Sequence, residues 1–504
     1  MTQISGKEMD EAMVATPVVI TTDAALFAYL GGLAAEAGLA IAPGRPEVGD
    51  PLAALDEALA QPGFAPIGLC LDRAVDGTAL CTSLIRASRQ GRMVIILRGA
   101  SAPDDHAVWE DMIGRTGAIL AHSIREFVDI TLFLAATADQ PLPAGRGVAI
   151  VTGGGGSGVN AADLCARLGL DVPPLGDESR ERLTPLVPPI ASLGNPIDIT
   201  PQMHAAQYAP NYPQVLSIIG SDPAIDTVFF PMNALTRTQD SRSGSVLAFR
   251  HATASTVLLA LNLIEAEEQV RLGRAGLYNF VEPERALGCL ARIKQAMAAR
   301  RTLETAPAYP DPAPVAVPAT LVDVLREAGV QVPPVRRVAS AAEAAAAIGA
   351  GDPLWQTGTP AAAIAGPMPT AAALEQARRA TETGEVQVRG QVAGRLALRL
   401  TARRHETFGP VLTLGAGGLY GALLSDAVTV PAAAAAAEPR AIIEALKIIG
   451  AYHKIDRDAD LARAANVVAA LARYAASPGA TGFAIDPLLI TADAVTAANV
   501  WTLG

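Results

Sequence analysis

Short apolar runs alternate with longer amphipathic segments through residues 17–136 of the chain. Such short runs of Val, Ile and Leu predict buried strands, and apolar positions at helical spacing, as over residues 25–37 and 78–89, predict helices between them. Strands joined through helices form parallel sheets, so this region is predicted to be a layered α/β domain. The predicted strands cover residues 18–20, 67–71, 93–97 and 118–120.

The same alternation returns after a polar break. We therefore predict one α/β domain over residues 1–140 and a second over residues 146–300. A stretch dense in Pro and Ala over residues 301–318 is typical of a semi-rigid linker. Residues 319–504 begin with a helical pattern and have a strand-rich middle at 386–414, so a domain of α+β type is expected there.

A glycine-rich turn opens the second domain. An apolar run at residues 148–151 is followed by Thr152, by glycines, and by an Ala/Leu pattern at helical spacing, which predicts strand, turn and helix in that order. Glycines let the backbone approach a ligand, and the free N–H groups at a helix start favour an anion. The turn is therefore a candidate phosphate or carboxylate site, with a ligand-free βα turn as the alternative. Its residues are Gly153, Gly154, Gly155, Gly156, Ser157 and Gly158.

We expect this turn to use backbone dihedrals that only glycine reaches easily. A β-branched residue in place of Gly154 or Gly156 should then abolish anion binding, because the turn would lose its allowed conformation. Unchanged ligand affinity in such a variant would contradict the predicted site.

Composition and charge exclude several classes of function. The formal net charge of −11 argues against general binding of nucleic acid or of an anionic membrane surface. The amino-terminal segment is polar and acidic, and no apolar run reaches membrane-spanning length, so a cytoplasmic location is expected. The widely spaced cysteines predict reduced, buried thiols, and the isolated histidines predict no zinc or iron site.

Two motifs together resemble the NDP-forming acyl-CoA synthetases, the succinyl-CoA synthetase superfamily. One is the strand with its Gly-Gly-x-Gly turn, and the other is Gly-Asn-Pro-Ile-Asp at residues 194–198. Residues 68–99 look like the ligase domain that carries a phosphorylated histidine in the family, and residues 328–334, 405–428 and 483–490 look like landmarks of the ATP-grasp domain. The implied fold is two flavodoxin-like parallel α/β ligase domains followed by an ATP-grasp-like α+β domain. From the resemblance we expect this sequence to begin in the ligase domain, without a counterpart of the family's amino-terminal CoA-binding domain.

The resemblance implies a phosphoryl relay whose parts are altered here. In the family, a phosphohistidine is held between two helix starts, one of which is the glycine turn. The other falls on residues 21–24, where Asp23 would place a carboxylate at the phosphate position. The family's histidine loop is missing after the strand at 93–97, and His106 is the nearest imidazole, with a surface helix-start histidine as the alternative. Asp72 stands where the family has a glutamate near that histidine, or is simply an acid at a strand end.

The nucleotide site that the resemblance implies is also depleted. No lysine occurs from residue 295 to residue 446, and the family's metal-binding glutamates fall on Ala397 and Ala422. Asp426 and Asp486 remain as the acids for nucleotide or metal. We therefore expect CoA as a cofactor and expect ordinary Mg-ATP chemistry to be impaired.

Three classes of function are consistent with this sequence. The first is an acid–CoA ligase acting on a carboxylic acid or acyl-CoA, with Asn195 and Asp198 in the substrate or CoA region. The second is a non-catalytic relative that binds an acyl-CoA or a protein partner, and the third is ATP-independent acyl or carbamoyl transfer. A separate CoA-binding subunit and a homo- or hetero-oligomer are expected from the resemblance, and no nucleic acid or membrane partner is expected.

Overall fold

The computed structural model describes most of the chain in separate stretches. They fall into two compact units, of which unit 1 comprises Met1–Val75, Ala79–Pro103 and Ile113–Ala306, and unit 2 comprises Asp76–Thr78, Asp104–Met112 and Pro307–Gly504. The described residues are 14–44, 49–63, 65–99, 103–143, 145–232, 241–305, 320–333, 336–338, 353–356, 386–390, 396–418, 421–424, 426–452, 458–491 and 493–503.

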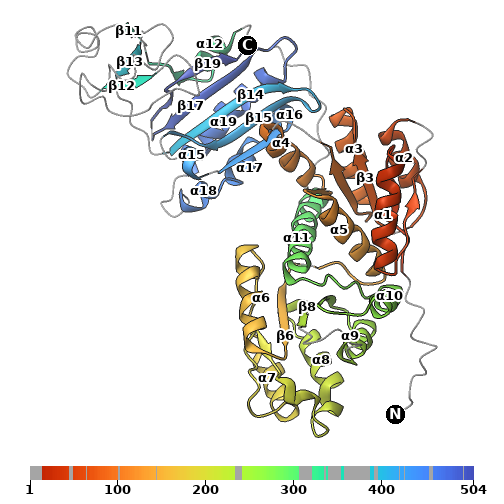
Figure 1. The fold of residues 1–504 in the computed structure, drawn as a ribbon. Coiled ribbons are helices and arrows are strands. Elements are labelled where there is room, and N and C mark those ends of the chain that lie inside the picture. The colour runs from red at the N-terminus through yellow and green to blue at the C-terminus, as the bar shows by residue number, and fades with distance from the viewer. Residues whose placement is uncertain are drawn as a thin grey trace. The chain divides into compact units, whose positions relative to one another are not determined.

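The first sheet of unit 1, in which Figure 1 labels β3, is wholly parallel. Its strand order is β2-β1-β3-β4-β5. The chain winds from β1 to β2 on one side and then to β3 on the other, so β1 and β3 diverge at a topological switch point. This order confirms a flavodoxin-like α/β domain. Its strands are β1 (Val18–Ile20), β2 (Ala42–Pro43), β3 (Ile67–Leu71), β4 (Val94–Arg98) and β5 (Ile119–Ala121), and its helices are α1 (Ala24–Glu36), α2 (Pro51–Ala60), α3 (Gly77–Arg89), α4 (Pro103–Gly114) and α5 (Ile124–Ala136).

The second sheet of unit 1 repeats the same winding in the order β7-β6-β8-β9. Its first strand again lies between the second and the third, so the carboxyl ends of β6 and β8 form a second switch point. The strands are β6 (Gly147–Thr152), β7 (Ile197–Asp198), β8 (Ile225–Met232) and β9 (Thr256–Leu261). The α-helices are α6 (Gly155–Arg167), α7 (Asp177–Leu183), α8 (Tyr212–Gly220), α9 (Ser241–Ala252), α10 (Ala266–Arg274) and α11 (Pro283–Thr305), and the 3-10 helices are η2 (Thr184–Leu186), η3 (Pro201–His204) and η4 (Ala209–Asn211).

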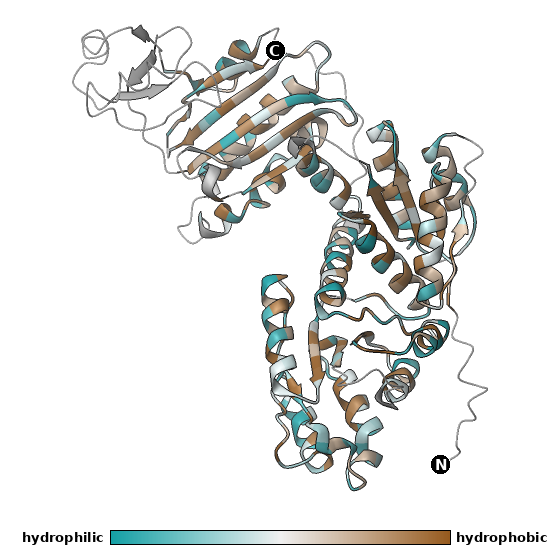
Figure 2. Ribbon diagram, viewed as in Figure 1, coloured by the Kyte–Doolittle hydropathy of each residue, from teal (hydrophilic) through white to brown (hydrophobic). Residues whose placement is uncertain are grey.

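Helices α5 and α11 join the two sheets into one unit. Residues 127–136 of α5 are all buried, and they share one core with residues of both sheets. In the middle of α5, the buried Asp129 carboxylate accepts hydrogen bonds from Tyr278 Oη at 2.8 Å and Arg285 Nε at 2.8 Å. Figure 2 shows the strands coloured mainly as hydrophobic, as expected for sheets covered on both faces. The predicted linker begins later than expected, since α11 continues to Thr305 and residues 306–319 lie outside the described stretches.

Unit 2 is built on a mainly antiparallel sheet in the order β10-β18-β17-β14-β15-β16, with β19 paired to β17. Helices α12, α16, α17 and α19 pack on one face, where alternate residues of β14 enter the core. This is the expected α+β domain. Its strands are β10 (Val330–Gln331), β14 (Leu396–His405), β15 (Gly409–Ala416), β16 (Ala427–Pro431), β17 (Gly482–Ile490), β18 (Val495–Ala497) and β19 (Val500–Leu503). Its helices are α12 (Leu321–Glu327), α15 (Gly421–Leu424), α16 (Ala432–Ala437), α17 (Pro439–Glu444), α18 (Lys447–Tyr452) and α19 (Asp458–Ala476).

A small second sheet in unit 2 has the order β11-β13-β12, formed by β11 (Arg336–Val338), β12 (Pro353–Gln356) and β13 (Val386–Gly390), all antiparallel. The strand-rich middle predicted at residues 386–414 therefore divides between the two sheets of unit 2, with β13 in the small one and β14 and β15 in the large one.

None of the helices in the described stretches combines the length and apolar character that crossing a bilayer requires.

Candidate functional site

The glycine turn lies between β6 and the first turn of α6, at the carboxyl end of the second sheet. Gly154 is the N-cap residue of α6, and no side chain at this position accepts the first helical N–H groups. The Thr152 hydroxyl holds the turn from inside, accepting from Gly154 N at 3.2 Å and lying 3.1 Å from Gly154 O. Uncapped amides at the positive end of a 13-residue helix form a donor site for an anion.

The glycines of this turn are not required by backbone dihedrals, which corrects the expectation from the sequence. None of Gly153–Gly158 has a positive φ, and Gly154 has an extended φ of −161°. At Gly154 and Gly156, a Cβ would meet nothing within 4 Å, whereas at Gly158 it would lie 3.0 Å from Pro196 Cβ. Gly158 is thus required for packing, but Gly154 and Gly156 leave open space beside exposed amides. Space of that kind suits a ligand that approaches the backbone closely.

Asn195 supports β6 from the side. Its side-chain oxygen accepts from Ile150 N at 3.0 Å, and its side-chain nitrogen donates to Val148 O at 2.7 Å and to Pro173 O at 2.8 Å. The side-chain amide of Asn195 therefore takes the place of a neighbouring strand beside β6, and both its oxygen and its nitrogen are hydrogen-bonded to backbone groups. This residue positions the turn rather than presenting a group to a ligand.

Asp198 brings a carboxylate next to the turn. Its Oδ2 lies 3.5 Å from the place a Cβ of Gly155 would occupy, and its Oδ1 accepts from Thr200 N at 2.9 Å. Thr200 has a φ of 60°, which is unusual for a residue with a branched Cβ. Strained residues of this kind concentrate at ligand sites. The second switch point thus combines backbone donors with one carboxylate acceptor.

The equivalent turn of the first sheet, between β1 and α1, is closed to a ligand because a side chain caps the helix. Asp23 is the N-cap of α1, and its Oδ1 accepts from Ala25 N at 2.8 Å and from Leu26 N at 3.0 Å. The helix amides that could bind a phosphate are therefore already satisfied by a carboxylate. A second anion at this point would face both repulsion and the loss of the donors.

Asp72 lies across the first switch point, directly after β3. Thr22 donates a short hydrogen bond from its hydroxyl to Asp72 Oδ2, and Arg73 Nε lies 3.5 Å from Asp72 Oδ1. The hydrogen bond from Thr22 lowers the pKa of the half-exposed Asp72 carboxyl, with a further contribution from Arg73. Asp72 is therefore ionised at neutral pH and bridges the β1 and β3 loops.

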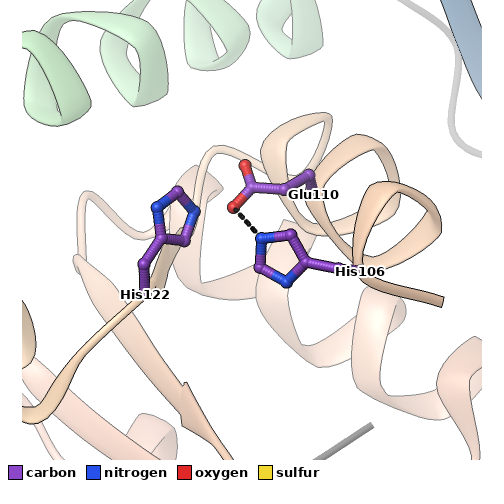
Figure 3. A group of neighbouring side chains, drawn as sticks. All are labelled: His106, Glu110 and His122. Carbon is purple, nitrogen blue, oxygen red and sulfur yellow. Dashed lines mark ion pairs between the residues drawn. The ribbon is translucent and has the colours of Figure 1, made fainter. Parts of the chain in front are cut away.

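His106 lies in the first turn of α4, within unit 2. Its side chain is 55% exposed, and its Nε2 lies 3.8 Å from Glu110 Oε1 one turn later (Figure 3). This placement matches the alternative of a surface histidine at a helix start. His122, which Figure 3 also draws, belongs to unit 1, where its Nδ1 lies 3.9 Å from Glu126 Oε2 and its Nε2 lies 3.3 Å from an Arg292 nitrogen.

The two predicted acids of unit 2 have different environments. Asp426 is buried, and its two oxygens accept from Lys447 N at 2.9 Å and Ile448 N at 2.8 Å, so it caps α18. Asp486 is partly exposed on β17, accepts from Gly418 N at 2.7 Å and lies 3.9 Å from Arg399 Nε. Burial raises the pKa of Asp486. Both oxygens of Asp426 are thus hydrogen-bonded to backbone amides, whereas one oxygen of Asp486 faces the Arg399 guanidinium.

Two family models match this chain. The model of the Ligase-CoA domain matches residues 148–230, which contain the glycine turn, and the model of the ATP-grasp domain matches residues 359–501. The alpha subunit of the ADP-forming acetate–CoA ligase II of Pyrococcus furiosus is 27% identical over 197 residues, which are 38% of this chain and 41% of that protein. These two domain matches fit the NDP-forming acyl-CoA synthetases, which the sequence motifs also resemble.

Two further matches have lower identity. The ADP-forming acetate–CoA ligase I of Archaeoglobus fulgidus is 24% identical over 220 residues, which are 43% of this chain and 30% of that protein. The apo structure of the dinucleotide-forming acetyl-coenzyme A synthetase 1 of Ca. Korarchaeum cryptofilum is 20% identical, covers 58% of this chain and 68% of its own, and gives a TM-score of 0.49. The matched region spans less than half the length of the curated relatives.

Sequence reasoning missed three residues that shape these sites. Thr152 has a local signal, because a threonine between a strand and a glycine turn often bonds to the turn backbone. Thr200 and Arg399 have none, because the strained φ of Thr200 and the approach of Arg399 to Asp486 arise only in the folded chain.

Proposed function

We propose that the chain is an acid–CoA ligase of the NDP-forming type, acting on a carboxylic acid and its CoA thioester at the second switch point of unit 1. The observation that carries this proposal is the uncapped start of α6, where Gly154 and Gly156 leave open space beside helix amides. Phosphate groups of CoA or of an acyl phosphate are ligands for such donors. The match of residues 148–230 to the Ligase-CoA domain supports the same assignment.

Within this proposal the protein groups have distinct roles. The amides of the turn bind and orient the anionic group, with Thr152 fixing the turn from inside. Asn195 holds β6 in place, and the Asp198 carboxylate accepts a hydrogen bond from a hydroxyl or amide of the ligand. CoA fits this set of residues, since it offers phosphates to the donors and polar groups to the acceptor.

A second candidate function is acyl-CoA binding or ATP-independent acyl or carbamoyl transfer, without a phosphoryl relay in this chain. The observation that favours it is the capping of α1 by Asp23, which occupies the helix start where the family would hold a phosphohistidine. A heteromer in which another subunit supplies the missing parts reconciles the two candidates. Two of the curated relatives are named as alpha subunits.

The proposal is tested by incubating the full chain with acetyl-CoA, ADP and phosphate, which a ligase of this type converts to acetate, CoA and ATP. Acetyl-CoA is the first choice because the curated relatives are named for acetate. Release of CoA thiol that requires both ADP and phosphate supports the ligase. Thiol release without ADP supports the second candidate.

Binding at the turn is measured separately by calorimetry with CoA. Gly156→Val should weaken CoA binding by at least about tenfold, because a side chain then stands over amides whose charge-assisted hydrogen bonds are worth about 1.5–3 kcal/mol each. The matched control is Asn160→Val, which introduces valine in place of an exposed asparagine one turn further along α6. Equal affinities of the two variants would contradict the site.

A further inference from the structure

The sheet of unit 2 has a face that is opposite its helix-covered core. Leu398 and Leu400 of β14 enter the core, so the intervening residues point to the other face. A row of directly paired residues crosses that face over five strands. This row consists of Thr429, Thr413, Thr401, Ala484 and Trp501.

Next to this row, β14 and β17 share an irregularity in their pairing. The register shifts between Leu398 and Leu400, which places Arg399 and Asp486 beside each other on the two strands. Arg399 Nε lies 3.9 Å from Asp486 Oδ2, and the Arg399 side chain is 53% exposed. β-bulges commonly redirect side chains at binding sites.

The match to an ATP-grasp domain implies a divalent cation that bridges nucleotide phosphates at such a sheet. Among the described residues of unit 2, the acids at this sheet do not fit such a cation. Mg²⁺ requires near-octahedral oxygen ligands from one or two carboxylates, waters and phosphates, with no competing cation beside it. Asp486 already accepts from Gly418 N, and its other oxygen faces Arg399. Asp426 is held by α18, and a methyl group stands at Ala397.

We infer that Arg399 takes the place of the divalent cation, so that unit 2 binds the phosphates of an adenine nucleotide without metal. Asp486 orients the guanidinium through their ion pair, and the half-exposed head group is free to contact a phosphate from the solvent side. Arginine suits this role because its planar N–H groups bind phosphate in a bidentate manner and remain charged at all physiological pH values. This inference concerns unit 2 and does not depend on the acyl transfer proposed for unit 1.

Calorimetric titration of the full chain with ADP tests the inference, once in EDTA and once in excess MgCl₂. Binding should be no tighter in MgCl₂ than in EDTA, because neither Asp426 nor Asp486, the two acids predicted for this site, leaves a carboxylate open to the metal. Arg399→Gln should weaken binding by at least about tenfold in both buffers, and Arg399→Lys by less, because the charge remains. Arg403→Gln serves as the matched control, since Arg403 is exposed on the same strand and face.

Three outcomes overturn the inference. One is ADP binding that appears only with Mg²⁺, and another is a loss in Arg403→Gln as large as that in Arg399→Gln. Absence of ADP binding in both buffers also overturns it, but CoA binding in the same preparation would leave the function proposed for unit 1 standing. Thermal melting of each variant shows whether the fold is retained, which is expected because both arginines are exposed.

Discussion

The two sheets of unit 1 have the same winding but opposite chemistry at their switch points. In the second sheet, α6 starts at Gly154 with no side-chain cap, and its first amides face open space. In the first sheet, the N-cap of α1 is Asp23, whose carboxylate accepts hydrogen bonds from two of the first amides of α1. The residue at the N-cap thus decides whether the first amides of the helix are open or already hydrogen-bonded to a side chain.

The comparison also separates the roles of the acids near each switch point. Asp198 lies beside the open turn and accepts from backbone at only one oxygen, whereas Asp72 bridges to Thr22 across the closed one. An acid beside open donors helps to select a ligand, but an acid bonded to the neighbouring loop mainly stabilises the fold. The phosphoryl relay that the family implies would need both switch points to be open.

Exchanging the caps should have the largest effect. Gly154→Asp gives α6 the same cap as α1, so the carboxylate should occupy the amides and weaken CoA binding by at least about tenfold. Thermal stability should not fall, because an N-cap aspartate stabilises a helix start. Calorimetry with CoA and a thermal melt measure the two quantities.

The control for this exchange is Gly154→Ala. It adds a Cβ where nothing lies within 4 Å and where φ is extended, and it adds no acceptor. Its loss of CoA affinity should be clearly smaller than that of the aspartate variant, since no donor is consumed. If the alanine variant lost as much affinity as the aspartate variant, space rather than capping would explain the difference between the two turns.

The reverse exchange should have a moderate effect. Asp23→Gly releases Ala25 N and Leu26 N, and it costs only a few tenths of a kcal/mol because glycine is itself a tolerated N-cap. Phosphate should therefore raise the melting temperature of this variant more than that of the unchanged chain, at equal ionic strength. Asp50→Gly, which removes the cap of α2, is the control. An equal phosphate effect in both glycine variants would mean that the first switch point is not a latent anion site.

The smallest expected effect concerns the bridge across the closed switch point. Thr22→Val removes the hydrogen bond that most lowers the pKa of Asp72, so this pKa should rise towards its ordinary value. A lowered folded-state pKa stabilises the fold above the unfolded value and loses that contribution as the pH falls through the folded value. The stability difference between variant and unchanged chain should thus be constant near neutrality and vanish at pH values well below about 4.

NMR titration of the Asp72 carboxyl and denaturant melts at several pH values check this prediction. Thr22→Ser keeps the hydroxyl and should keep the lowered pKa. If the stability difference between Thr22→Val and the unchanged chain persisted at low pH, the lost stability would come from packing of the introduced valine side chain and not from the missing hydrogen bond.

The local periodicity of this sequence was sufficient for most of the strands of unit 1. Short apolar runs predict β1 and β3 at their observed bounds, and they predict β4, β5 and β6 to within one residue at either end. Periodicity was less informative for α5, which is buried on all sides over residues 127–136 and therefore has no polar face to set a period. The end of α11 was also missed, since its last turns lie in a segment whose composition resembles a linker.

For the candidate site, the sequence by itself determined which residue types stand at each helix start: glycines before α6 and an aspartate before α1. Capping depends on residues within three positions of each other, so the closed state of α1 could be expected from the sequence alone. Only the tertiary structure decided that the Asn195 side chain is hydrogen-bonded to β6, that Asp426 caps α18 and that Arg399 forms an ion pair with Asp486. The physical reason is that a carboxylate, an amide or a guanidinium becomes structural or available according to partners that are distant in the chain.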